Sequence, residues 1–326
     1  MRQLIVEMQR FPLGQAFVIS RGSRSEAVVV VVKLREGDAT GHGECVPYAR
    51  YGESLESVIE QIEALRPQIE AGIDRPALQN AIKAGAARNA IDCALWDLEA
   101  KITHVPAHIL AGIDRLSPAT TAYTLSLGTP DSMFKAAQTA AHRPLLKVKL
   151  GGAGDAARIA AVRAGAPESS LIVDANEAWT PEIYAENLAA CVLADVELIE
   201  QPLPAGADEA LAHLPRLIPI CADESVHDRH GLSELRARYD AINIKLDKTG
   251  GLTEALLLAQ AASDLGFKLF IGCMVGTSLA MAPALLLAGG AQYVDLDGPL
   301  LLAKDRENGL TYQDSVVFPP KASLWG

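Results

Sequence analysis

Residues 119–298 repeat one arrangement eight times, and this repetition constrains the fold more than any other feature of the sequence. A short run rich in β-branched residues ends in a polar or charged residue, and a stretch rich in alanine and leucine follows it. Successive runs begin about 25 residues apart, which suits parallel strands joined by helical crossovers, since a βαβ unit takes about 30 residues. The eight runs cover residues 121–128, 145–150, 170–176, 196–202, 219–225, 241–247, 268–274 and 293–298.

Eight such units close most economically into a barrel. The sequence therefore predicts an α/β fold with a TIM-like (β/α)7β barrel. An open, doubly wound sheet is the alternative. No GxGxxG motif follows any of the predicted strands, and the Gly151-Gly152 pair indicates a turn, so nucleotide binding is not expected.

The segments on either side of the barrel follow other patterns. Residues 1–118 begin with strand-like alternation and continue with helical patterns at 54–72 and 80–102, which favours an α+β capping domain. The barrel is expected to cover residues 119–298. Residues 299–326 contain no further repeat unit, so we expect them to return to the capping domain and complete it.

Charge and cysteine content exclude several classes of protein. The net charge is −11 without a basic stripe, so neither nucleic acid nor an anionic membrane is an expected partner. No run of 18 uncharged apolar residues predicts a transmembrane helix, and Glu7 and Arg10 interrupt any signal peptide. The five cysteines form no CxxC pair, which argues against a disulfide framework or a zinc site. We therefore expect a cytoplasmic protein.

Three consecutive predicted strands end in carboxylates, namely Asp174, Glu200 and Asp223. The carboxyl ends of barrel strands meet at one mouth, so these side chains are expected at similar depth. One such carboxylate alone could cap a helix or form an ion pair. Three that converge repel one another unless a hard divalent cation holds them, and an all-oxygen set favours Mg²⁺. The pattern predicts one Mg²⁺ per subunit.

Lysines flank these carboxylates along the chain. Lys147 and Lys149 alternate in the preceding strand and so share a face, and Lys245 ends the strand that follows the three. Strands two and six of an eight-stranded barrel are opposite each other, so Lys149 and Lys245 are expected to face each other across the metal. Neighbouring cations and an apolar mouth favour a neutral lysine, as a general base requires. Two bases on opposite faces of one carbon predict inversion of a stereocentre.

The eighth strand carries two further carboxylates, Asp295 and Asp297. They have no place among the metal ligands, and such a pair at the rim suits a substrate ammonium group. Salt bridges to nearby Lys or Arg are the alternative. Cys273 lies within the seventh predicted strand, and no histidine stands near a strand end to activate it, so we do not expect a thiol nucleophile.

The motifs KVK, DAN, EQP, ADES, NIKLDKTGG and DLDG occur in this order, and through them the chain resembles the enolase superfamily, in its muconate-lactonizing subgroup. DLDG is the specific part, because Asp-x-Asp on the eighth strand marks the L-Ala-D/L-Glu epimerases and other dipeptide epimerases. The resemblance extends almost end to end and includes FVISRGSRSEA, GECVPYARYGES and GCMVGTS. It implies a Mg²⁺-dependent isomerase that converts L-Ala-D-Glu to L-Ala-L-Glu through an enediolate, as in murein peptide recycling.

The resemblance also implies a role for each candidate residue. Asp174, Glu200 and Asp223 would bind the metal, and Lys149 and Lys245 would be the acid and base. The remaining residues would contact the dipeptide: Lys147 at its carboxylate, Asp295 and Asp297 at its ammonium, and Thr124, Cys273 and Val275 along the pocket. An arginine of the first module would bind the glutamate side chain. Arg21 and Arg24 both qualify, and we prefer Arg24.

Other functions remain open at this point. A dipeptide epimerase of other specificity, a cycloisomerase or an o-succinylbenzoate-synthase-like lyase would use the same metal and lysines, although the last two need no ammonium site. A Schiff-base aldolase would need an isolated buried lysine, and a metal-dependent binding protein would need no turnover. The sequence assigns no oligomeric state.

Overall fold

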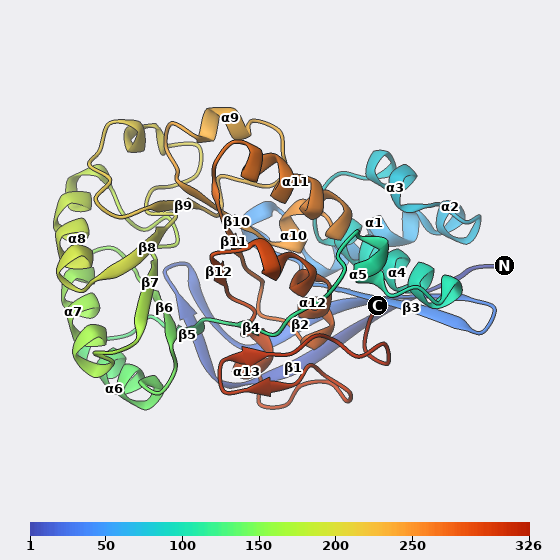
Figure 1. Cartoon of the computed structure of the whole chain (residues 1–326), viewed down its shortest axis with the longest axis horizontal. Helices are drawn as coiled ribbons and strands as arrows, with labels where there is room; N and C mark the ends of the chain where they lie inside the picture. Colours follow the sequence, from blue (N-terminus) through green and yellow to red (C-terminus); the bar gives the residue numbers. More distant parts are fainter.

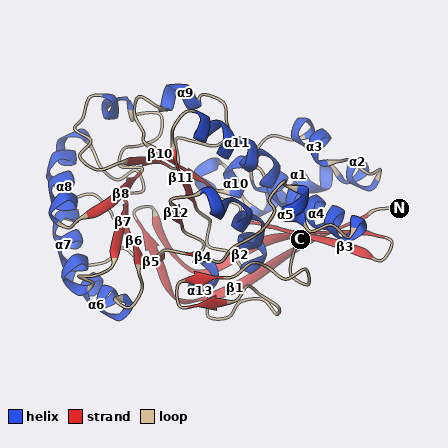
Figure 2. Cartoon of the chain, viewed as in Figure 1, coloured by secondary structure: helices blue, strands red, loops and turns tan.

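The first module in the computed structural model, which describes residues 1–326, is a three-stranded antiparallel sheet with helices against it (Figures 1 and 2). Its strands are β1 (Gln3–Ile19), β2 (Gly22–Glu36) and β3 (Ala39–Cys45). Successive side chains of a strand point to opposite faces. Val30 and Val32 therefore pack in the cluster formed with the helices, whereas Val29 and Val31 join the cluster that continues into the barrel. Burial of both faces explains the unbroken valine run.

The short 3-10 helix η1 (Ala49–Tyr51) follows, and then five α-helices: α1 (Leu55–Ala64), α2 (Arg66–Glu70), α3 (Arg75–Ala81), α4 (Ala86–Thr103) and α5 (Ala107–Leu110). The helical patterns expected at 54–72 and 80–102 are each interrupted. Pro67 lacks the N–H that would continue the ladder of α1. Gly85, with φ of 148°, turns the chain before α4, a conformation that favours glycine. Helix α4 lies so close to β3 that a Cβ on Gly43 would sit 2.0 Å from the Ala90 carbonyl oxygen.

Eight parallel strands follow in a sheet whose spatial order matches the chain order. They are β5 (Tyr123–Leu125), β6 (Leu145–Lys149), β7 (Ser170–Asp174), β8 (Val196–Glu200), β9 (Ile220–Ala222), β10 (Ala241–Ile244), β11 (Lys268–Ile271) and β12 (Tyr293–Val294). The Ala122 N–H donates to the Val294 carbonyl at 2.7 Å and so links the first strand to the last. The predicted (β/α)7β fold class is confirmed.

The crossovers differ in length. Helices α6 (Pro130–Ala140), α7 (Asp155–Gly165) and α8 (Pro181–Leu193) form the outer edge at the left of Figure 1. The next two crossovers contain only η2 (Glu209–Ala212) and α9 (Leu232–Leu235). The remaining helices are α10 (Leu246–Thr249), α11 (Leu252–Asp264), α12 (Ser278–Ala284), η3 (Leu285–Gly290) and α13 (Gly298–Leu301). No helix has both the length and the apolar character needed to cross a membrane.

The last segment runs back over the first module. Strands β13 (Tyr312–Gln313) and β14 (Val316–Val317) form a small sheet with β4 (Ala119–Thr120). The Ala303 N–H donates to the Pro12 carbonyl at 2.8 Å, and the buried Trp325 indole donates to the Cys93 carbonyl at 3.0 Å. Both chain ends therefore lie beside the capping module, at the right of Figure 1.

Candidate active site

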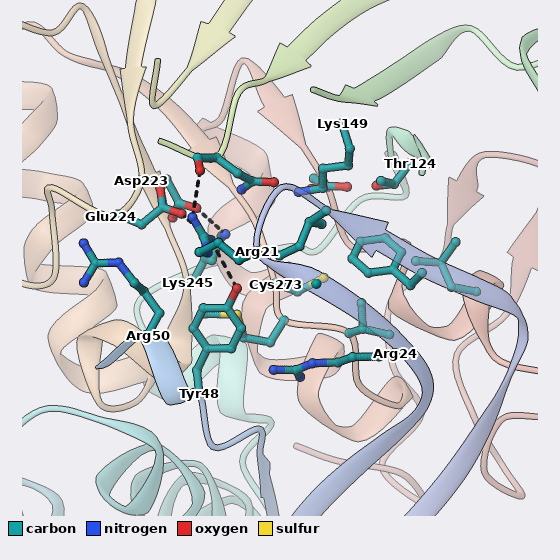
Figure 3. Close-up of a pocket in the computed structure, with 18 of the residues that line it drawn as sticks. Arg21, Arg24, Tyr48, Arg50, Thr124, Lys149, Asp223, Glu224, Lys245 and Cys273 are labelled. Carbon is teal, nitrogen blue, oxygen red and sulfur yellow. Dashed lines mark hydrogen bonds and ion pairs between the residues drawn. The ribbon is translucent and has the colours of Figure 1, made fainter. Parts of the chain in front are cut away.

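A cavity of about 440 Å³ opens at the carboxyl ends of the barrel strands, under the β1–β2 turn and residues 48–51 (Figure 3). Most residues that the sequence selected line it, whereas Asp174 and Glu200 lie beneath the lining and contact its lysines. The selected residues in the lining are Arg21, Arg24, Thr124, Lys147, Lys149, Asp223, Lys245, Cys273, Val275, Asp295 and Asp297.

The alternation of side chains along each strand explains why charged residues, here called the floor, lie at the bottom of this cavity. A lower layer inside the barrel is apolar and includes Ile172, Leu198 and Cys221. Two residues further along each strand, the same inward face carries Asp174, Glu200 and Asp223. Strand register sets Lys149 beside Asp174 and Asp174 beside Glu200, so the carboxylates stand at similar depth on neighbouring strands.

Lysines neutralise the three carboxylates. The Nζ of Lys149 lies 2.6 Å from Asp174, that of Lys147 lies 2.7 Å from Glu200, and that of Lys245 lies 2.6 Å from Asp223. In this arrangement no group of three His, Cys, Asp or Glu side chains is spaced to hold a metal ion. The donor set nevertheless fits Mg²⁺, because it consists of buried carboxylate oxygens that already face positive charge.

Protonation within this cluster follows from burial and charge. Burial and the Asp174 charge raise the pKa of Glu200 to about 7. Against the effect of burial, Lys149 and Lys147 lower the pKa of Asp174 to about 2. Burial also lowers the pKa of Lys245, but Asp223 and Glu200 outweigh it and hold that pKa well above its ordinary value. The sequence predicts instead that neighbouring cations favour the neutral form of the lysines. In this structure the neighbouring carboxylates outweigh burial and favour the charged form of Lys245.

Two residues that sequence reasoning missed orient the carboxylates. Lys248 donates to Asp223 Oδ1 at 2.6 Å and to the Asn243 carbonyl at 2.9 Å. The Asn243 amide donates to Glu200 Oε1 at 2.7 Å. Both stand in the NIKLDKTGG motif, which was the available signal. Periodicity alone could not identify Lys248, because it lies on the four-residue helix α10.

The two carboxylates after β12 differ in their partners. Asp295 Oδ2 lies 2.8 Å from Lys147 Nζ, so the alternative of a salt bridge holds for this residue, but its buried Oδ1 has no hydrogen-bond partner. Asp297 Oδ2 accepts a 2.7 Å bond from the Thr124 N–H and pairs with no cation. Burial and the Asp295 charge raise the pKa of Asp297 to about 7. A cation bound here would relieve the repulsion between the two side chains.

The two candidate arginines of the β1–β2 turn have different surroundings. Arg21 donates to Glu224 at 2.7 Å and to the Asn176 carbonyl at 2.9 Å, so barrel residues already occupy its guanidinium. Arg24 makes no ion pair, and its guanidinium carbon lies 5.3 Å from the centre of the Tyr48 ring. In Figure 3 Arg24 lies well apart from the carboxylates that surround Arg21. Arg24 is therefore the guanidinium available to an anionic ligand.

Cys273 and Val275 follow β11 and line the cavity. Burial and the charges of Asp295 and Asp297 raise the pKa of the Cys273 thiol well above its ordinary value. No histidine lines the cavity. The thiol therefore has no histidine to activate it, and with its raised pKa it lines the pocket as a small neutral side chain.

Comparison with known families gives two matches that together cover most of the chain. Residues 1–112 match the mandelate racemase/muconate lactonizing enzyme N-terminal domain, and residues 133–322 match the enolase C-terminal domain-like family. The resemblance to the enolase superfamily is confirmed.

Two relatives cover almost the whole chain. The L-Ala-D/L-Glu epimerase of Escherichia coli K12 is 51% identical over 318 residues, which are 96% of this chain and 98% of that protein. The N-acetyl-D-glutamate racemase of a Pseudoalteromonas species is 48% identical over 301 residues, which are 91% of this chain and 95% of that protein.

The solved structures that resemble this chain include dipeptide epimerases and a protein with homology to them. An Agrobacterium tumefaciens enolase family member, with homology to dipeptide epimerases and with bound sodium and L-Ala-L-Glu, is 53% identical over all of both chains, with a TM-score of 0.99. The Enterococcus faecalis dipeptide epimerase, complexed with Mg and L-Leu-L-Tyr, is 29% identical with a TM-score of 0.90. That alignment covers 98% of this chain and 97% of that chain.

Proposed function

Because the chain belongs to the mandelate racemase/muconate lactonizing enzyme family of the enolase superfamily, we propose that it is an L-Ala-D/L-Glu epimerase. It inverts the α-carbon of the C-terminal glutamate. The observation that carries this proposal is the charge pattern of one cavity, with a lysine–carboxylate floor beside Asp297, a buried carboxylate that has no cation. In a short peptide, the carboxylate would lie at the lysine–carboxylate floor and the ammonium beside Asp297.

Lys149 and Lys245 are proposed as the acid and base. Lys149 ends strand two of the barrel, Lys245 directly follows strand six, and both line the cavity, so they approach a bound α-carbon from different sides. The neutral lysine takes the α-proton and leaves an enediolate, and the other lysine, as an ammonium, returns a proton to the opposite face. The two amines then have exchanged protonation states, and no redox step is needed.

The remaining polar groups bind and stabilise the substrate. Lys147 lies among three carboxylates at the floor and is proposed to stabilise the negative charge that develops on the substrate carboxylate. Asp174, Glu200 and Asp223 would hold one Mg²⁺, which supplies Lewis-acid stabilisation of the same charge. Asp295 and Asp297 are proposed to bind the ammonium, and Arg24 the glutamate side chain. Thr124, Cys273 and Val275 enclose the peptide.

N-acetylglutamate racemisation is a second candidate, favoured by the relative of that activity. An acetyl group brings no positive charge, so it would leave Asp297 and the partnerless Asp295 Oδ1 without compensation. An ammonium group compensates both. The dipeptide reaction is therefore the better match to this cavity. We further propose that it takes place in the cytoplasm, in the recycling of cell-wall peptides.

Proton NMR of L-Ala-L-Glu in D₂O tests the proposal directly. With enzyme and Mg²⁺ we expect loss of the glutamate α-proton signal and the appearance of the second diastereomer. An excess of chelator should stop both changes, and added Mg²⁺ should restore them. N-acetyl-L-glutamate, assayed in parallel, should exchange more slowly. Faster exchange of N-acetyl-L-glutamate than of any dipeptide would exclude the proposed substrate.

A further inference from the structure

A second cavity, of about 520 Å³, adjoins the candidate active site. It lies between the end of β1, strand β5, helix α6 and helix α13, and much of its lining is apolar, including Leu125, Met133 and Ala136. Three residues line both cavities, namely Phe17, Thr124 and Leu301. We call Phe17 and Leu301, the two apolar residues among these three, the wall.

The wall stands at the end of the active site that carries Asp297. The Thr124 N–H donates to Asp297, and Asp297 is the N-cap of α13, on which Leu301 lies one turn later. Residues four apart on a helix share a face. On the other side, the Phe17 ring lies with its centre 5.9 Å from Lys149 Nζ. Leu301 therefore adjoins the proposed ammonium site, and Phe17 adjoins the proposed acid/base Lys149.

Backbone hydrogen bonds hold the wall in position. The Leu127 N–H donates to the Val18 carbonyl at 2.9 Å, which ties the chain next to Phe17 to the loop after β5. The Ala303 N–H donates to the Pro12 carbonyl, which ties the segment after Leu301 to β1. The wall residues are half-buried. The boundary between the cavities is therefore built by two fixed segments rather than by surface side chains.

We propose that Phe17 and Leu301 restrict the N-terminal residue of the dipeptide to a small side chain, and that the second cavity accepts larger apolar side chains once the wall is reduced. This inference rests on the proposed function. In a bound dipeptide, the carbon that bears the ammonium also bears the N-terminal side chain, so that side chain must lie near the wall. Cys273 and Val275 also line the active site, but neither of them lines the second cavity.

The test compares Leu301→Ala, Phe17→Ala and the double variant with wild type on L-Ala-L-Glu and L-Leu-L-Glu, by exchange of the glutamate α-proton. Pockets for apolar groups discriminate about 10- to 200-fold. The ratio of kcat/KM for L-Leu-L-Glu to that for L-Ala-L-Glu should therefore rise tenfold or more. Leu300→Ala is the matched control. Leu300 lines only the second cavity, so its truncation should leave the ratio within about twofold.

An unchanged ratio in Leu301→Ala and in the double variant overturns the inference, and so does an equal rise in Leu300→Ala. The milder Phe17→Leu and Leu301→Val replace variants that fail to fold, with the same ratio as the criterion. The activity of the wild-type protein on L-Ala-L-Glu distinguishes a failure of the proposed function from a failure of the proposed role of the wall. Its absence overturns the proposed function together with the inference, whereas wild-type activity with an unchanged ratio overturns only the role of the wall.

Discussion

Asp297→Asn removes one charge from the proposed ammonium site without changing its shape. The asparagine side-chain oxygen can still accept the bond from the Thr124 N–H, so the backbone there need not move. A hydrogen bond to a charged group contributes about 1.5–3 kcal/mol. At 1.4 kcal/mol per factor of ten, its loss should lower kcat/KM for L-Ala-L-Glu by about 10- to 150-fold. Asp295 keeps its pair with Lys147, so the catalytic lysines should be little disturbed.

The dependence on pH gives this prediction a second measurement. The pKa of Asp297 is about 7, so its carboxyl group loses its charge as the pH falls from 8 to 6. In wild type the KM for L-Ala-L-Glu should therefore rise over that range, and in Asp297→Asn this rise should be absent. The pKa of Asp297 is higher in the folded than in the unfolded protein. This carboxyl group therefore destabilises the fold more and more as the pH rises from about 4 to about 7. The variant should be the more stable protein at pH 8, by an amount that shrinks toward pH 4.

The assay is α-proton exchange at several pH values, with urea unfolding alongside, and N-acetyl-L-glutamate is the control substrate because it carries no ammonium. In Asp297→Asn, the kcat/KM for N-acetyl-L-glutamate should fall little or should rise. An equal loss for both substrates, or no loss for the dipeptide, would refute the assignment of Asp297 to the ammonium.

Three further predictions concern the bases, the side-chain pocket and the capping module. Lys149→Met and Lys245→Met should each lower the rate of epimerisation by about 100- to 10,000-fold, measured by NMR, while circular dichroism shows an intact fold. Arg24→Met should reduce the preference for L-Ala-L-Glu over L-Ala-L-Gln about tenfold or more, because the glutamine amide carries no charge for Arg24 to bind. Gly43→Ala should lower the free energy of unfolding by about 3 kcal/mol, measured in urea, because the new Cβ would clash with Ala90.

Each of the three predictions can be contradicted by a specific measurement, and two have a matched control variant. Full activity in either lysine variant would remove that residue from the two-base scheme. Arg21→Met is the comparison for Arg24→Met, and a larger change of preference in Arg21→Met would reverse the assignment. Gly289→Ala is the comparison for Gly43→Ala, since a Cβ at Gly289 meets nothing within 4 Å. Equal stability of the two glycine variants would contradict the close approach of α4 and β3.

Much of the barrel and its charged floor could be predicted from the sequence, because a single period determines both. Side chains alternate along a strand, and parallel strands end at one mouth, so a charged residue at a strand end has a defined direction. Asp174, Glu200 and Lys149 are such residues, and each ends its strand. Their roles in catalysis and metal binding remain proposals.

The parts that could not be predicted depend on contacts between distant segments. The choice between Arg21 and Arg24 depends on Glu224, which reaches the β1–β2 turn from the loop after β9. Lys248 lies on a helix too short to produce a periodic signal. The interruption of the helix before Gly85 could be recognised only from the φ angle of that residue, because the surrounding alanines favour one continuous helix. The deciding feature is thus a distant side chain for Arg21, a short helix for Lys248 and a backbone conformation for Gly85.

The return of the last segment to the first module has a consequence for synthesis on the ribosome. Residues 299–326 supply contacts to β1 and α4, including the buried Trp325, which fills space against the Cys93 backbone. The first module therefore cannot complete its packing until residues 299–326 have been translated, although domains generally fold from the N-terminal end. A truncation before residue 299 should accordingly leave a chain whose earliest-made strands still expose an unfinished surface to chaperones and proteases.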